Sequence, residues 1–151
     1  MIIREIELFK GIDTDVMNKI AAIGVSETHP KGTVLFERGD EADRLYILEE
    51  GNVNLMVTNG GTLSFSLTEP GSVFGWSAMV EPGKYTASCI CGLDSKVIMI
   101  ERDKLDKIFD EHPKEGLKVM KRLGAIFSER LTTSYRNYLS ALRHDTTPSY
   151  G

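Results

Sequence analysis

Between His29 and Ile100, apolar and polar residues alternate in short runs that glycine-containing turns separate. The runs at 53–57 and 63–67 alternate strictly, and Asn-Gly-Gly at 59–61 is a hairpin signal. Many short strands with regular turns predict a mainly β fold, an antiparallel double-stranded β-roll of jelly-roll-like form. The other strand-like runs lie at 34–36, 45–48, 73–74, 85–91 and 97–100.

Helical spacing flanks this β region on both sides. Asp13 is a predicted N-cap for a helix that runs to Ile23 and closes at Gly24. After the strands, Asp103 begins a second helix that stops before Pro113. A long helix then follows over residues 114–143. Its apolar positions near heptad a and d spacing are Leu117, Met120, Gly124, Phe127, Leu131, Tyr138 and Ala141.

The stretch from Pro70 to Ser88 stands in the middle of the strands and carries the strongest local signal. A Pro-Gly turn leads into Val73-Phe74, and Gly75 permits a sharp turn because it has no Cβ. Residues 76–80 suffice for one or two helical turns, a second turn follows at 81–83, and a strand pattern resumes at Tyr85. The first amides of such a small helix attract anions, which makes this stretch the candidate binding site.

Composition narrows the class of protein. The chain has 151 residues, 41% of them hydrophobic, a formal net charge of −4, and no apolar run of membrane-spanning length. We expect one domain over residues 1–143 and a flexible tail at 144–151, with no signal peptide and no membrane contact. The acidic charge argues against a nucleic-acid-binding domain. Cys89 and Cys91 lie two apart in one strand and are unsuited to pair, so we expect a reducing, cytoplasmic setting.

The central stretch resembles the phosphate-binding cassette of the cyclic nucleotide-binding domains, the sensor domains of catabolite-activator-type regulators. Residues that match the family pattern are Phe74, Gly75, Ala78, Met79, Val80, Thr86 and Ala87, and residues 31–51 are similar to the first half of that domain. The resemblance implies a roll over about 29–101 and C-terminal helices over about 102–143. Two recognition positions depart from the pattern. Trp76 stands where the family has a ribose-binding Glu, and Tyr85 stands where it has a phosphate-pairing Arg.

The resemblance implies a regulatory, non-enzymatic domain in which a ligand in the roll acts on the C-terminal helix. Because a Tyr hydroxyl cannot replace the charge of an Arg, we expect weak or no binding of cAMP and cGMP. The ligand is then another small planar or anionic molecule, or Trp76 and Tyr85 fill the pocket and leave a ligand-free interaction domain. The implied ligand-binding residues are Leu55, Val57 and Phe65 as an apolar floor, Phe74, Gly75, Trp76, Ser77, Ala78, Lys84, Tyr85 and Thr86 in the cassette, and Thr133 and Ser134 on the long helix.

The long helix is also the expected dimer contact, and an unidentified protein partner is an alternative. Regulators of this family carry a helix-turn-helix after this helix, whereas only eight residues follow position 143 here, so we do not expect direct DNA binding by this chain. A metal-dependent jelly-roll enzyme is a distant alternative, because His29, His112 and His144 are not patterned as ligands. The expected dimer residues are Leu117, Met120, Phe127, Leu131 and Tyr138.

Overall fold

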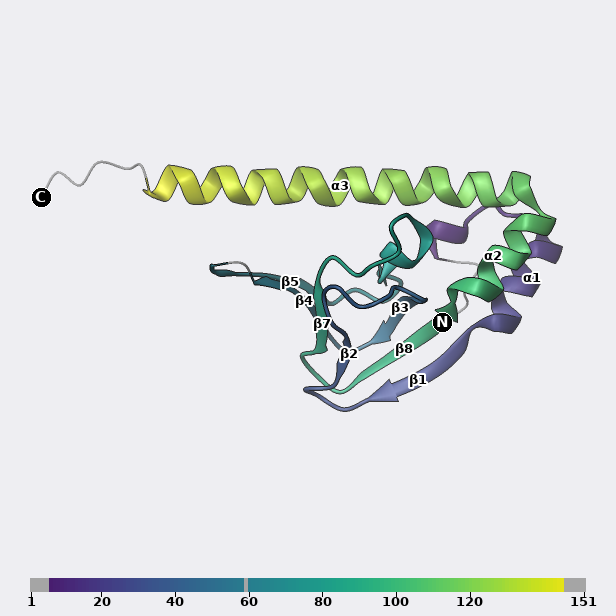
Figure 1. The fold of residues 1–151 in the computed structure, drawn as a ribbon, viewed down its shortest axis with the longest axis horizontal. Coiled ribbons are helices and arrows are strands. Elements are labelled where there is room, and N and C mark those ends of the chain that lie inside the picture. Colours follow the sequence, from purple (N-terminus) through teal and green to yellow (C-terminus); the bar gives the residue numbers. More distant parts are fainter. Residues whose placement is uncertain (1–5, 59, 146–151) are drawn as a thin grey trace, which may run out of the picture.

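The computed structural model of the protein describes residues 6–58 and 60–145. These residues form two four-stranded antiparallel sheets that make up the predicted roll, with helices at one end and a long helix across it (Figure 1). One sheet has the strand order β1-β8-β3-β6 and the other the order β2-β7-β4-β5. The strands are β1 (Val25–His29), β2 (Val34–Phe36), β3 (Arg44–Glu50), β4 (Val53–Thr58), β5 (Thr62–Leu67), β6 (Val73–Phe74), β7 (Ser88–Cys91) and β8 (Ser95–Glu101).

The helices follow the predicted order. Asp13 caps the first α-helix as expected, since its carboxylate accepts a hydrogen bond from the Asp15 N–H at 3.0 Å. None of the helices in the described residues has the length and apolar character that a membrane-spanning segment requires. The helical segments are η2 (Glu7–Phe9), α1 (Thr14–Ile23), the short 3₁₀ helix η3 (Trp76–Met79), α2 (Arg102–Glu111) and α3 (Pro113–Asp145).

Two strand boundaries differ from the prediction. The roll begins at Val25 rather than near His29, because β1 pairs along its whole length with β8 although its own residues are mostly polar. Tyr85 is not in a strand: β7 begins only at Ser88, and the chain before it makes a single bridge between Glu41 and Lys84. The predicted tail lies outside the described residues from 146 onward.

Two clusters of buried side chains hold these layers together. One lies between the sheets of the roll and contains a stack of aromatic rings, Phe36, Tyr46, Phe74 and Tyr85. The other joins the outer face of the β8-β3-β6 strands to α1, α2 and the first part of α3. Gly116 permits the close approach of the last two helices, because a Cβ there would lie 2.9 Å from Cβ of Phe109.

The long helix α3 runs past the roll and continues beyond it toward the C-terminus (Figure 1). Its first part buries Val119 and Leu123 against the helices and the sheet. Its later part lies over the hairpin of β4 and β5, with which it shares a cleft. The fold thus places the cassette, the hairpin and α3 around one region of the molecule.

Candidate functional site

The backbone of the cassette is fixed by its pairing with β3. Phe74 and Val73 of β6 pair with Tyr46 and Ile47, and the chain then turns at Gly75 with a φ of 72°. A Cβ at this position would lie 3.1 Å from the carbonyl oxygen of Arg44, so both space and backbone conformation favour glycine. The turn delivers η3, whose Ser77 and Ala78 are buried, to the face below α3.

Tyr85 is a core residue of the roll. Its side chain is 5% exposed and its ring stacks on Phe36 with centroids 3.9 Å apart. The hydroxyl donates to the carbonyl oxygen of Arg44 at 2.8 Å and accepts from the N–H of the same residue at 3.3 Å. Burial raises the pKa of the phenol, so it remains neutral. Tyr85 therefore offers no charge to an anion, and its neighbours Lys84 and Thr86 are exposed to solvent.

Trp76 takes a different direction, out of the roll and toward α3. Its ring packs on Phe127 with centroids 4.0 Å apart, and the guanidinium carbon of Arg130 lies 4.2 Å from the Trp76 centroid. Both contacts are of kinds that stabilise packing beyond the burial of area alone. Trp76 thus fastens α3 to the cassette rather than filling the space in front of it.

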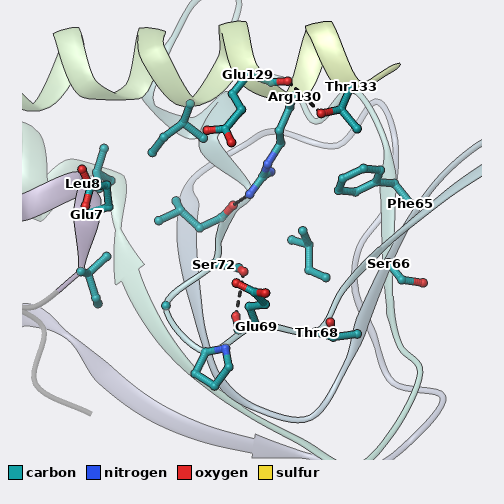
Figure 2. A pocket seen from close by; sticks show the side chains of 16 residues that line it. Glu7, Leu8, Phe65, Ser66, Thr68, Glu69, Ser72, Glu129, Arg130 and Thr133 are labelled. Carbon is teal, nitrogen blue, oxygen red and sulfur yellow. Dashed lines mark hydrogen bonds between the residues drawn. The ribbon is translucent and has the colours of Figure 1, made fainter. Parts of the chain in front are cut away.

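Arg130 is a candidate site residue that the sequence prediction did not include. Its Nη2 donates to the carbonyl oxygen of Val73 at 2.6 Å. Figure 2 shows the Arg130 side chain extending from α3. Its Nη1 is buried and has no hydrogen-bond partner among the described residues. Burial lowers the pKa of the guanidinium to about 10, opposed by the nearby Glu129 carboxylate, and the group is still a cation at neutral pH. The cassette lacks an arginine of its own, and α3 brings one to it.

Three hollows meet at this guanidinium. The smallest, of about 100 Å³, lies in front of the cassette between Phe36, Gly75, Tyr85 and Thr86. A second, of about 410 Å³, is the cleft between the β4–β5 hairpin and α3. It shares Leu55, Trp76 and Arg130 with the small hollow, so the two adjoin.

The third hollow is a groove of about 700 Å³ on the other side of Arg130, drawn in Figure 2. It lies between η2, the β5–β6 loop and α3. Three exposed carboxylates line it, from Glu7, Glu69 and Glu129. The groove therefore differs from the cleft in charge as well as in position.

The structure gathers only part of the expected binding residues. Leu55 and Phe65 pair across the hairpin and line the cleft, but Val57 does not, and its partner Leu63 does. Ser134 lines the cleft, whereas Thr133 lines the groove on the other side, so the two hydroxyls do not act together. Lys84 lines none of the three hollows. The alternation of the hairpin could have found Leu63, since it continues the row of Phe65 and Leu67.

The structure also brings only part of the expected dimer residues together on one surface. Leu117, Met120, Leu131 and Tyr138 are exposed on α3. Phe127 is not part of that stripe, because it packs against Trp76 within its own chain. Sequence reasoning missed three further exposed members of the stripe, Tyr135, Leu139 and Leu142.

No metal centre is formed by the described part of the chain, where no three His, Cys, Asp or Glu side chains come together. Cys89 and Cys91 are free, buried thiols. Burial raises the pKa of Cys89 to about 12, and that of Cys91 is raised for the same reason. Neither sulfur is therefore a thiolate at neutral pH.

The fold and cassette define a class of β-roll domains, and comparison with known proteins agrees. The family model of the cyclic nucleotide-binding domain matches residues 26–112, which is more than half of the chain. The chain therefore belongs to the cyclic nucleotide-binding domain family, a family of regulatory domains.

Solved structures and curated relatives show the same relationship. A cyclic nucleotide-binding-type protein of Geobacter metallireducens GS-15 is 28% identical, with a TM-score of 0.75 over 85% of this chain and 94% of that one. A cyclic nucleotide-binding domain of Methylobacillus flagellatus KT, at 24% identity and a TM-score of 0.78, covers 99% of this chain and 83% of its own, and shows the shared fold.

Among curated relatives, the cyclic AMP receptor protein of Thermus thermophilus is 25% identical over 82% of this chain. The chain spans 56% of that protein's length. It spans between 17% and 20% of the length of three further curated relatives.

Proposed function

We propose that this chain is a regulatory domain that senses a small molecule other than cAMP or cGMP and relays the signal through α3. The single observation that supports this most is the direct attachment of α3 to the cassette through Trp76, Phe127 and Arg130. Two of them, Trp76 and Arg130, line the adjoining cleft, so a ligand at that end of the cleft would contact them. Binding would therefore shift the equilibrium between two positions of α3. The size of the shift is set by the difference in the ligand's affinity for the two positions.

Weak binding of cyclic nucleotides follows from the state of the cassette. The hollow directly in front of it holds only about 100 Å³, so the cassette itself has little room for a ribose and a cyclic phosphate. The buried Tyr85 ring forms part of its wall, and Trp76 stands in place of the carboxylate that would bind ribose in the family. A cyclic nucleotide would thus lose two contacts and need the core to open.

Isothermal titration calorimetry with cAMP and with cGMP tests this part of the proposal. We expect no binding of either nucleotide in the micromolar range. A dissociation constant that is micromolar or tighter for either one would contradict it.

We further propose that two copies of the chain associate through the exposed stripe of α3. Leu131, Tyr135 and Tyr138 are exposed on the later part of α3, and Leu131 and Tyr135 line none of the three hollows. A contiguous apolar surface of this kind usually marks an interaction site, and a two-fold axis would place the same stripe on both sides of the contact.

A ligand-free dimerisation domain is the second candidate. It is favoured by the packing of Phe36 and Tyr85, which fills the interior next to the cassette. Native mass spectrometry of the freshly purified protein separates the two candidates. A mass above that of the bare dimer, removed by mild activation, supports sensing, whereas the bare dimer mass alone favours the scaffold.

A further inference from the structure

The cleft between the β4–β5 hairpin and α3 is lined almost entirely by apolar and uncharged side chains. Leu55, Leu63 and Phe65 form the hairpin wall, while Trp76 closes the inner end and Tyr138 lies on the helix side. Its other lining residues are small or uncharged, and Arg130 is the one charged side chain among them. A molecule in this cleft would therefore meet apolar and aromatic surface along its body and one cation at its inner end.

The guanidinium of Arg130 is prepared for an anion. Only Nη2 is used within the described residues, by the Val73 carbonyl, and Nη1 is buried without a hydrogen-bond partner. Unmade hydrogen bonds of buried donors are costly, and planar anions pair readily with guanidinium groups. The stacking of Arg130 on Trp76 holds the group in a fixed orientation at the cleft. None of the described residues that line the cleft carries a carboxylate that would compete for it.

The volume of the cleft and the acidic lining of the groove narrow the class of ligand further. About 410 Å³ lies within the range of ordinary small-molecule sites. On the far side of Arg130, the groove carries Glu7, Glu69 and Glu129, which would repel an anion. An anion is therefore directed to the cleft side of the guanidinium.

We infer that the cleft binds a small organic anion with an aromatic or otherwise apolar body, and that Arg130 pairs with its charged group. This inference rests on the proposed sensing function and assigns the ligand class of that site. The charged group is a carboxylate, sulfonate or phosphate, and the body lies between Phe65 and Tyr138. Arg130 supplies from α3 the cation that the cassette lacks, so ligand binding engages the helix directly.

Two dyes with nearly the same aromatic body test the inference by fluorescence titration. 8-Anilinonaphthalene-1-sulfonate carries the anionic group, and N-phenyl-1-naphthylamine lacks it. We expect the wild-type protein to bind the sulfonate more tightly. Changing Arg130→Gln should weaken sulfonate binding by about tenfold or more, and change binding of the neutral dye by less than about threefold. The matched control Arg136→Gln removes a cation from the exposed face of the same helix and should change neither affinity.

A second pair of variants keeps the test decisive if Arg130→Gln disturbs folding. Leu63 is 70% exposed at the cleft, so substitutions there should leave the fold intact. Leu63→Glu should weaken sulfonate binding much more than Leu63→Gln, because only the former adds a repelling charge. Circular dichroism checks that each variant is folded.

The outcomes distinguish this inference from the function on which it rests. If both dyes bind equally well and Arg130→Gln or Leu63→Glu changes them equally, the anion class is wrong while ligand sensing stands. If the wild-type protein binds neither dye, the inference fails, while the sensing proposal is judged separately by the native mass of the freshly purified protein. Selective loss of the sulfonate in both variants supports the inference.

Discussion

The two halves of α3 are built from similar residues but have different surroundings. Before Arg130, the helix turns Val119, Leu123 and Phe127 toward its own domain, where they are buried or packed on Trp76. After Arg130, apolar side chains such as Leu131 and Leu139 are exposed. The difference shows that apolar spacing on a helix predicts that a face will be covered, but not what covers it.

The comparison is sharpest for two leucines of the same helix. Leu123 is 1% exposed and Leu139 is 56% exposed. We expect Leu123→Ala to lower the free energy of unfolding by about 2–5 kcal/mol because it leaves a cavity in the core. Leu139→Ala should change it by about 0.5 kcal/mol or less at protein concentrations low enough for the chain to be a monomer, because this side chain is exposed on a single copy. Urea unfolding followed by circular dichroism measures both, and equal losses would mean that the second half of α3 is packed in solution.

The exposed stripe can be broken without touching the anchored half. Leu131→Asp combined with Tyr135→Asp would place charges in the proposed dimer contact without changing the cleft, and like charges would face each other near the two-fold axis. We expect this double variant to sediment as a folded monomer. Phe127→Ala serves as the contrasting change, since Phe127 packs on Trp76 within the chain and its loss should leave the dimer intact. A wild-type protein that is already monomeric at high micromolar concentration would contradict the dimer.

The contacts of Trp76, which lie at the junction of the two halves of α3, should contribute measurably to the stability of the fold. Trp76→Ala removes the aromatic contact with Phe127 and the cation–π contact with Arg130, a loss of about 1–3 kcal/mol. Trp76→Phe keeps an aromatic ring and should lose less. Unfolding in urea gives the energies. Hydrogen exchange should show faster opening of α3 near residues 126–133 in Trp76→Ala, whereas unchanged exchange there would mean that this contact does not hold the helix.

The smallest expected effect on stability concerns Glu115 at the start of α3, which is hydrogen-bonded to the N-cap residue of α1. Its carboxylate accepts a hydrogen bond from the N–H of Asp13 at 3.1 Å and from Nζ of Lys118 at 3.3 Å. These partners, the Asp13 N–H first, lower the pKa of Glu115 below its ordinary value of 4.5. Because the folded state favours the charged form, its stabilisation is present above pH 4.5 and is lost as the pH falls through the lowered pKa.

Glu115→Gln tests this link. The variant should be less stable than wild type at pH 7, and the difference should shrink as the pH falls below 4.5. Thermal unfolding at a series of pH values measures it, with Glu50→Gln, a change at an exposed site, as the control. A difference that stays constant across this range would show that the charge of Glu115 is not the cause.

Most of the fold could be predicted from the sequence because its strands and helices carry clear local signals, such as hydrophobic alternation and capping residues. The alternation in the hairpin runs gave β4 and β5 with the turn between them, and Asp13 marked the start of α1. The strand β1 escaped prediction because its residues, Val-Ser-Glu-Thr-His, are mostly polar. Its place is set by pairing with β8, which is far away in the sequence.

The candidate site was harder to predict because its main contacts come from different elements. The sequence located the cassette and the unusual residues Trp76 and Tyr85, but not the opposite directions that their side chains take. Arg130 lies 54 positions after Trp76, and nothing in the local pattern of α3 distinguishes it from the exposed Arg136. Only the crossing of α3 over the cassette brings this guanidinium to the Val73 carbonyl.

The relay through α3 is tested most directly by hydrogen exchange along this helix in the wild-type protein. Exchange is compared with and without saturating 8-anilinonaphthalene-1-sulfonate, the anionic dye expected in the cleft. We predict that the dye changes exchange at residues 126–142, around Arg130 and the exposed half, and leaves residues 115–123 as they were. Binding of the dye with no change anywhere in α3, or with an equal change in both halves, would contradict the account.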